Sequence, residues 1–112
     1  RVEYSYLIEF DNRGLAIAQS LLCIGTENKT FIPNEPVISA IKNGAPSFAL
    51  LHNHPNGTRW SRKDKETNLY FRVLADINKK KFLNHCVIGK QPYYMRDEQP
   101  DVFHEFRGGN SI

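Results

Sequence analysis

The stretch Leu50–Asp64, LLHNHPNGTRWSRKD, determines how the rest of the chain is interpreted. It begins at the end of a short apolar run whose length and flanking breakers predict a buried strand. His52 and His54 follow, and positions two apart on a strand share a face. After a Pro-Asn-Gly turn, Ser61 and Asp64 lie where a helix should begin. Two histidines and one carboxylate, with a fourth position open, form the ligand set of a catalytic zinc.

The composition is that of one globular domain: 112 residues, of which 40% are hydrophobic and 24% charged. No run approaches the roughly 18 apolar residues that a membrane span needs, and the N-terminus has no signal-peptide pattern. The chain starts at Arg1 and its one Met is Met95, so we expect an excised domain. Cys23 and Cys86 lie in separate apolar stretches without a C-x-x-C motif. We therefore expect buried free thiols in a reducing compartment and a cytoplasmic protein.

The hydrophobic pattern predicts an α/β fold, with a mixed β-sheet and flanking helices. Alternation over 2–10 places the aromatic side chains of the first strand on one face and Glu3 and Glu9 on the less apolar face. A long helix is expected because Tyr70, Val73, Leu74 and Ile77 recur on one helical face. The expected elements are strands at 2–10, 15–24, 30–32, 47–51, 84–88 and 93–95, and helices at about 34–43, capped by Asn34, and about 62–80.

A hydrolytic zinc site also needs a proton acceptor, because zinc-bound water must lose a proton as it attacks. Glu3 and Glu9 are both candidates, and spacing alone does not choose between them. Ser61 and Asp64 also fit a helix capping box. The two roles are compatible, since a cap would hold Asp64 rigidly enough to bind a metal.

Taken together, these residues resemble the JAMM metalloprotease motif of JAB/MPN domains, and the RadC-like branch matches best. The resemblance covers roughly residues 2–98 and leaves 99–112 as a C-terminal tail. Its motifs are Glu3 with Asp11, Gly25-Thr26, HNHPNG at 52–57, Ser61-x-x-Asp64 and NHCVIG at 84–89. Three details differ from the usual pattern: six residues instead of seven separate His54 from Ser61, Asn56 replaces Ser, and Asn84 replaces Asp.

The resemblance implies a three-layer, cytidine-deaminase-like architecture and a Zn²⁺-dependent hydrolase of peptide or isopeptide bonds. By position, His52, His54 and Asp64 match the zinc ligands and Glu3 matches the general acid/base. Ser61 matches the serine that holds the attacking water or the oxyanion. His85 is expected to support the ligands without binding the metal itself.

Two other functions stay open. The net charge of +3, the pI near 9.0 and a basic cluster beside the site are compatible with DNA contact, as in a repair-associated protein. The same cluster also fits a simpler interpretation, in which the charged residues are solvated at the start of the helix and Trp60 packs down over it as a lid. Many MPN domains have lost their ligands, so a non-catalytic interaction module is the third possibility. The cluster consists of Arg59, Trp60, Arg62, Lys63 and Lys65.

Overall fold

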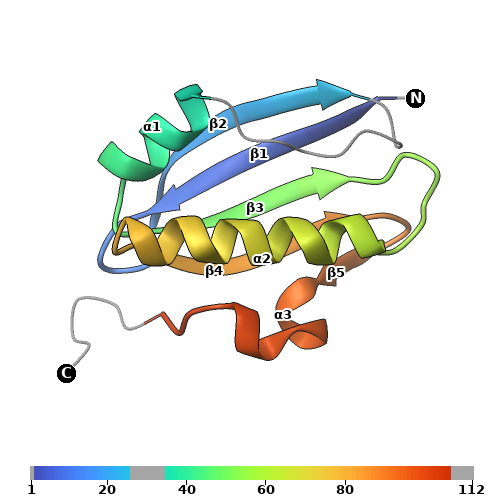
Figure 1. Cartoon of the computed structure of the whole chain (residues 1–112). Coiled ribbons are helices and arrows are strands. Elements are labelled where there is room, and N and C mark those ends of the chain that lie inside the picture. The colour runs from blue at the N-terminus through green and yellow to red at the C-terminus, as the bar shows by residue number, and fades with distance from the viewer. Residues whose placement is uncertain (1, 26–34, 107–112) are drawn as a thin grey trace.

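A mixed sheet of five strands, in the order β2-β1-β3-β4-β5, organises the chain (Figure 1). The computed structural model describes residues 2–25 and 35–106. The strands are β1 (Glu3–Phe10), β2 (Ala16–Gly25), β3 (Ser47–Asn53), β4 (Lys81–Ile88) and β5 (Pro92–Tyr94). The helices are α1 (Glu35–Asn43), α2 (Arg62–Ile77), α3 (Met95–Glu98) and a 3₁₀ turn, η1 (Pro100–Val102).

Strand directions follow from the connections. A tight turn joins β1 to β2 as an antiparallel hairpin, in which the Asp11 carboxylate accepts hydrogen bonds from the backbone N–H groups of Arg13 and Leu15. β1 also pairs antiparallel with β3. β3 and β4 run parallel because α2 carries the chain back between them, as a parallel pair requires. The site motif therefore lies at the carboxyl end of β3, where α2 begins.

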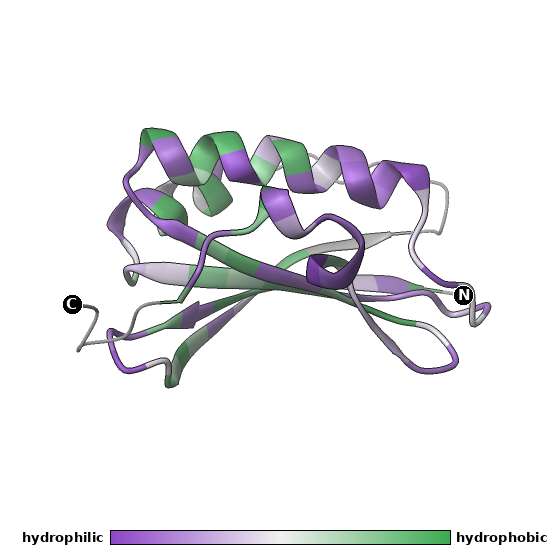
Figure 2. Ribbon diagram, turned by 90° about the horizontal axis from the view of Figure 1, so that it is seen from below, coloured by the Kyte–Doolittle hydropathy of each residue, from purple (hydrophilic) through white to green (hydrophobic). Residues whose placement is uncertain are grey.

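Both longer helices cover the same face of the sheet (Figure 2). Leu7 and Leu50 are paired on neighbouring strands and lie in one core cluster with Val37 of α1 and Phe71 of α2. Four phenylalanine rings fill the centre of this cluster at centroid distances of 4.8 to 6.2 Å: Phe48, Phe71, Phe82 and Phe103. Aromatic packing on one side of the sheet thus supplies most of the core.

No helix among the described residues covers the opposite face of the sheet. A row of paired residues crosses all five strands there, and its outer members are exposed: Leu21, Tyr6, Leu51, Cys86 and Tyr94. The predicted α/β class and mixed sheet are confirmed. The third layer that the architecture implied is not present within residues 2–25 and 35–106.

The alternation predicted for the first strand is correct, but the covered face is the less apolar one. Leu7 is fully buried beneath the helices, and Glu3 and Glu9 share its face. The aromatic face, which carries Tyr4 and Tyr6, is the open one. Burial therefore follows from where the helices pack, which the strand's own composition does not indicate.

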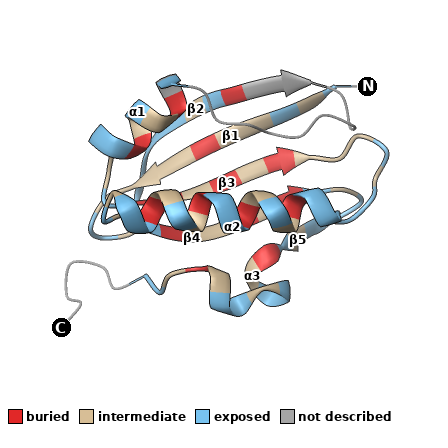
Figure 3. Cartoon of the chain, in the orientation of Figure 1, coloured by how far each residue is buried: buried red, intermediate tan, exposed pale blue. Residues whose placement is uncertain are grey.

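Most of the apolar stripe predicted for the long helix does not pack on the sheet. Val73 and Ile77 are 56% and 70% exposed and Tyr70 is exposed as well, whereas Leu74 packs against the core. Figure 3 shows buried and exposed positions alternating along α2. The buried positions of α2 are Asp64, Asn68, Phe71 and Ala75. Two of these four are polar, so hydrophobic periodicity alone cannot identify the face that packs on the sheet.

The chain beyond residue 98 does not form the expected tail up to residue 106. Phe103 is 5% exposed and packs on Phe82, with 4.8 Å between the ring centroids. His104 Nδ1 accepts a hydrogen bond from the backbone N–H of Phe82, and its Nε2 hydrogen-bonds to the Asp76 carboxylate on α2. The domain thus continues past the predicted boundary at residue 98.

Some expectations fall on residues outside the described part. These are the strand at 30–32, the Asn34 cap and the side chain of Cys23. Cys86 is a free thiol whose pKa is raised by burial. None of the described helices is long and apolar enough to cross a membrane.

Replacing Phe103 with Ala should lower the free energy of unfolding by about 3–5 kcal/mol, because it removes a buried ring from the core. Phe106→Ala, three residues later, is the matched control. Its ring is 43% exposed, so a change within about 0.5 kcal/mol is expected. Urea denaturation followed by circular dichroism measures both. Equal stability of the two variants would mean that the segment after residue 98 does not belong to the core.

Candidate metal centre

Two histidine side chains converge at the carboxyl end of β3. The Nε2 atoms of His52 and His54 lie 2.9 Å apart. Asp64, from the first turn of α2, places Oδ1 3.1 Å from the Nε2 atom of His52 and Oδ2 3.4 Å from that of His54. The Glu3 carboxylate completes the group, 3.8 Å from His52 Nε2. The structure thus brings together the four residues that the sequence singled out as ligands and base.

Asp64 is held in place by the start of α2. Ser61 is the N-cap, and it forms a reciprocal capping box with Asp64: Ser61 N–H donates to Asp64 Oδ2 at 2.7 Å, and Asp64 N–H donates to Ser61 Oγ at 3.4 Å. Ser61 Oγ also lies 3.1 Å from Asp64 Oδ2. The capping role is therefore real. It fixes one carboxylate oxygen and leaves Oδ1 directed at His52.

Asp64 is ionised although it is buried. Burial alone would raise its pKa, but hydrogen bonds with His52 and His54 outweigh that effect and hold the pKa well below its usual range. The same contact acts in the opposite direction on the histidine: the hydrogen bond with Asp64 raises the pKa of His54. The site therefore favours the protonated form of His54 more than water does.

The short segment between His54 and Ser61 forms a tight, hydrogen-bonded loop. Gly57 turns the chain at a φ of +82° and donates its N–H to the His54 carbonyl at 2.9 Å. The Asn56 side chain accepts hydrogen bonds from the N–H and hydroxyl of Thr58. Gly89 lets this loop approach β4, because a Cβ at that position would lie 2.2 Å from the Thr58 carbonyl oxygen. Six residues are therefore sufficient to connect the histidines to the helix cap.

The hydrogen bonds behind His54 determine its tautomer. Its Nδ1 lies 2.9 Å from the carbonyl oxygen of Arg59, which can only accept a hydrogen bond. The proton of the neutral ring is therefore on Nδ1. Its Nε2 lone pair is directed at His52 and Asp64, as a metal ligand requires.

A buried line of side chains sets the tautomer of His52 in the same way. Asn68 donates its amide N–H to Gln99, so its Oδ1 accepts from Nδ1 of His85, 2.7 Å away. His85 is neutral, because burial lowers its pKa to about 3, and its Nε2 then accepts from Nδ1 of His52 at 2.7 Å. His52 is left with a bare Nε2 facing the site.

These assignments test whether a cation fits. In the neutral tautomers, two bare imidazole nitrogens and an ionised carboxylate face one another within 2.9 to 3.4 Å, with no donor between them. Such an arrangement is repulsive unless a positive charge lies at its centre. Nitrogen and carboxylate donors are those that Zn²⁺ prefers. The donor set therefore fits a divalent transition metal.

A second combination, His52, Asp64 and His85, also places ligand atoms within 4.8 Å of one another. The Nε2 lone pair of His85 is, however, occupied by the hydrogen bond from His52. His85 thus holds His52 from behind, and His52, His54 and Asp64 are left as the candidate ligands. The sequence prediction for its role agrees with this geometry.

The two candidate bases are separated by the length of β1. Glu9 lies at the far end, where its Oε2 accepts a hydrogen bond from the N–H of Ala45 at 2.8 Å. Glu3 lies at the site, and its side chain is 13% exposed. The geometry therefore selects Glu3.

Sequence reasoning did not identify Asn68 and Gln99. Both lie in segments whose hydrophobic pattern carries no sign of chemistry. The only available signal was a polar residue one helical turn after Asp64, on the same face of α2. Asn84 Oδ1 accepts the backbone N–H groups of His85 and Arg96, and the second of these bonds holds the start of α3.

The basic cluster is partly engaged in contacts of its own. Arg59 and Lys65 both stack on the Trp60 ring, at 4.6 and 4.4 Å from its centroid. Arg62 lies 3.6 Å from Glu66, one turn along the exposed side of α2. Trp60 itself packs against the core. DNA contact through this cluster stays a prediction.

Comparison with known proteins gives the same family as the motifs. A family model described as "RadC-like JAB domain" matches residues 1–100. A UPF0758 protein of Pasteurella multocida is 35% identical over 94 residues, which cover 82% of this chain and 42% of the relative. A UPF0758 protein of Finegoldia magna is 34% identical, covering 78% of this chain and 40% of the relative.

A UPF0758 protein of Streptococcus equi subsp. zooepidemicus is 31% identical over 103 residues, covering 90% of this chain and 46% of the relative. The chain thus spans less than half the length of these relatives. The family match extends over nearly the whole domain and includes both strands and the helix that form the metal centre. The chain belongs to the family of RadC-like JAB domains.

Proposed function

We propose that this domain is a zinc-dependent hydrolase that cleaves a peptide or isopeptide bond. One observation carries the proposal: two histidines with bare Nε2 atoms and an ionised Asp converge beside a nearly buried Glu. A core stabilised only by packing has no need for such an arrangement, because it buries mutually repulsive groups.

His52, His54 and Asp64 would hold the metal, which leaves the remaining coordination to water and substrate. When bound, zinc supplies a lowered pKa for the attacking water and polarises the substrate carbonyl. The hydrogen bonds from His52 to His85 and from His54 to Arg59 keep both imidazoles in the ligating tautomer.

Glu3 would move the proton. Its carboxylate lies 3.8 Å from His52 Nε2 and could accept a proton from the attacking water. It can then deliver that proton to the amine nitrogen as the C–N bond breaks. Ser61, whose Oγ lies 3.1 Å from Asp64 Oδ2, would hold the attacking water or the developing oxyanion, as the resemblance to JAMM metalloproteases implies. The peptide or isopeptide class itself comes from the resemblance to JAMM metalloproteases.

The protein should bind one zinc ion per chain, and both His52→Ala and Asp64→Ala should lose it. Elemental analysis of protein purified without chelators measures the stoichiometry. His104→Ala and Asp76→Ala are the matched controls, since this pair lies outside the ligand group and should leave zinc content unchanged. Fresh protein without bound metal, and unable to take up added zinc, would contradict the proposal.

Zinc affinity should fall as the pH is lowered. The raised pKa of His54 means that the metal-free site holds a proton below that pKa, and zinc must displace it to reach Nε2. The apparent association constant should therefore fall about tenfold for each pH unit below the pKa of His54. Chelator competition between about pH 8 and about pH 5.5 measures this dependence. An affinity independent of pH in that interval would show that no proton is displaced.

Glu3→Gln should abolish hydrolysis while zinc is retained, because the amide keeps the size of the side chain but cannot accept the proton. The loss in kcat should be at least about 100-fold. Glu9→Gln is the control on the same face of the same strand and should keep activity. Fluorogenic peptides and a lysine-linked isopeptide provide the substrates. Zinc-loaded wild-type protein that cleaves neither class would favour the non-catalytic interaction module.

A further inference from the structure

We propose that Asn53 is a positioning residue, which holds the Glu3 segment of β1 at a set distance from the two histidines. This inference rests on the proposed function, in which Glu3 is the base. Asn53 lies between His52 and His54 in the chain, but strand alternation turns its side chain to the opposite face of the sheet. Its carboxamide hydrogen-bonds to the backbone of Val2 and Tyr4.

The need for such a residue arises because β1 and β3 separate at the site. Their backbone pairing ends at Ser5 and His52. Beyond that point β3 turns toward β4, where the N–H of His54 donates to the Ile88 carbonyl at 2.7 Å. The separation makes room for the ligand group. It also leaves the start of β1, which carries Glu3, without backbone hydrogen bonds to β3.

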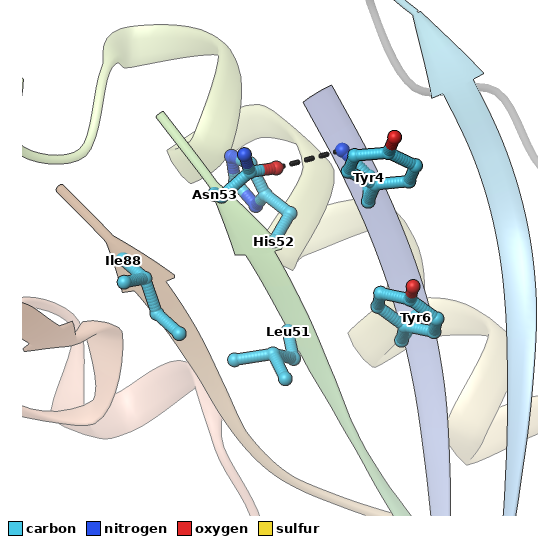
Figure 4. A pocket seen from close by; sticks show the side chains of 6 residues that line it. All are labelled: Tyr4, Tyr6, Leu51, His52, Asn53 and Ile88. Carbon is cyan, nitrogen blue, oxygen red and sulfur yellow. Dashed lines mark hydrogen bonds between the residues drawn. The ribbon is translucent and has the colours of Figure 1, made fainter. Parts of the chain in front are cut away.

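The carboxamide of Asn53 bridges this gap. Its Oδ1 accepts a hydrogen bond from the Tyr4 N–H at 2.7 Å (Figure 4). Its Nδ2 donates to the Val2 carbonyl at 3.2 Å. A carboxamide carries the same donor and acceptor as a peptide group, so it continues the ladder where the backbone of β3 has left it. The two bonds lie on either side of Glu3.

The position of Glu3 follows from these two hydrogen bonds. Its backbone is fixed on both sides, so its side chain must enter the helix-covered face, where it lies 3.8 Å from His52 Nε2. On its other side, pairing with β2 fixes β1 in the sheet. The two Asn53 bonds set the distance between β3 and the first residues of β1, which lie beyond the last β1–β3 backbone pair. Asn53 itself lines an apolar pocket with Tyr4, Tyr6, Leu51, Ile88 and the ligand His52 (Figure 4).

The first measurement is amide hydrogen exchange by NMR in the full chain, and it does not depend on activity. The Tyr4 amide should be protected in the wild type although it lies beyond the last β1–β3 backbone pair. Asn53→Leu, similar in volume but without donor or acceptor, should raise its exchange rate about tenfold or more. Asn53→Asp keeps the acceptor and should preserve much of this protection. Gln19→Leu, on the exposed part of the same face, is the control and should change nothing at Tyr4.

The second measurement separates positioning from folding or zinc binding. Asn53→Leu should lower kcat by about tenfold to a hundredfold, with zinc affinity within about threefold of the wild type. In a Glu3→Gln background the same change should have little further effect on the residual rate, because Asn53 acts only through Glu3. A structural defect would lower the rate in both backgrounds.

Each result decides the inference. Unchanged Tyr4 exchange in Asn53→Leu would overturn it, as would an equal loss of rate in the Glu3→Gln background. If the wild type hydrolyses no substrate, the proposed function fails. The positioning role of Asn53 is then still tested by amide exchange and by a crystal structure of Asn53→Leu. In that structure the Glu3 carboxylate should have moved away from His52, and an unchanged 3.8 Å separation would also overturn the inference.

Discussion

The antiparallel register between β1 and β3 is the constraint on which the centre depends. It pairs Ser5 with His52, and Glu3 then reaches the carboxyl end of β3 from a position about fifty residues earlier in the chain. The side-chain period of a strand is two, so a slip of one residue would turn Glu3 to the open face. The buried pair Leu7 and Leu50 opposes such a slip, because it would move Leu7 out of the core. Packing in the middle of the sheet thus determines chemistry at its end.

A buried line of hydrogen bonds forms the second constraint. It runs from Gln99 through Asn68 and His85 to His52, and each step assigns the proton of the next. An unpartnered group on this line would be costly, since it is shielded from water. The line also explains why α2 turns two polar residues toward the sheet. Asp64 serves the site directly, and Asn68, one turn later, serves it through His85.

The sequence was sufficient to predict the α/β class, most of the strands and the family, because these depend on local alternation and on short motifs with characteristic spacing. It did not identify which face of β1 or α2 is buried. Tyr70, Val73 and Ile77 satisfy a helical period, yet they lie in solvent while Asp64 and Asn68 are covered. Hydrophobic patterns assume that polar residues avoid the core, and a functional site violates that assumption. Asn53 and Asn68 were missed for a related reason: their roles depend on partners distant in sequence.

The same geometry sets a balance between stability and function. Two bare imidazole nitrogens and a carboxylate are held within 3.4 Å by groups that do not themselves bind the metal: the capping serine, the Arg59 carbonyl and His85. These supports use neither Nε2 atom, so they hold the ligand set in an arrangement that suits a cation. A bound metal would relieve the repulsion among the ligands and stabilise the folded state, because the unfolded chain does not hold these ligands together.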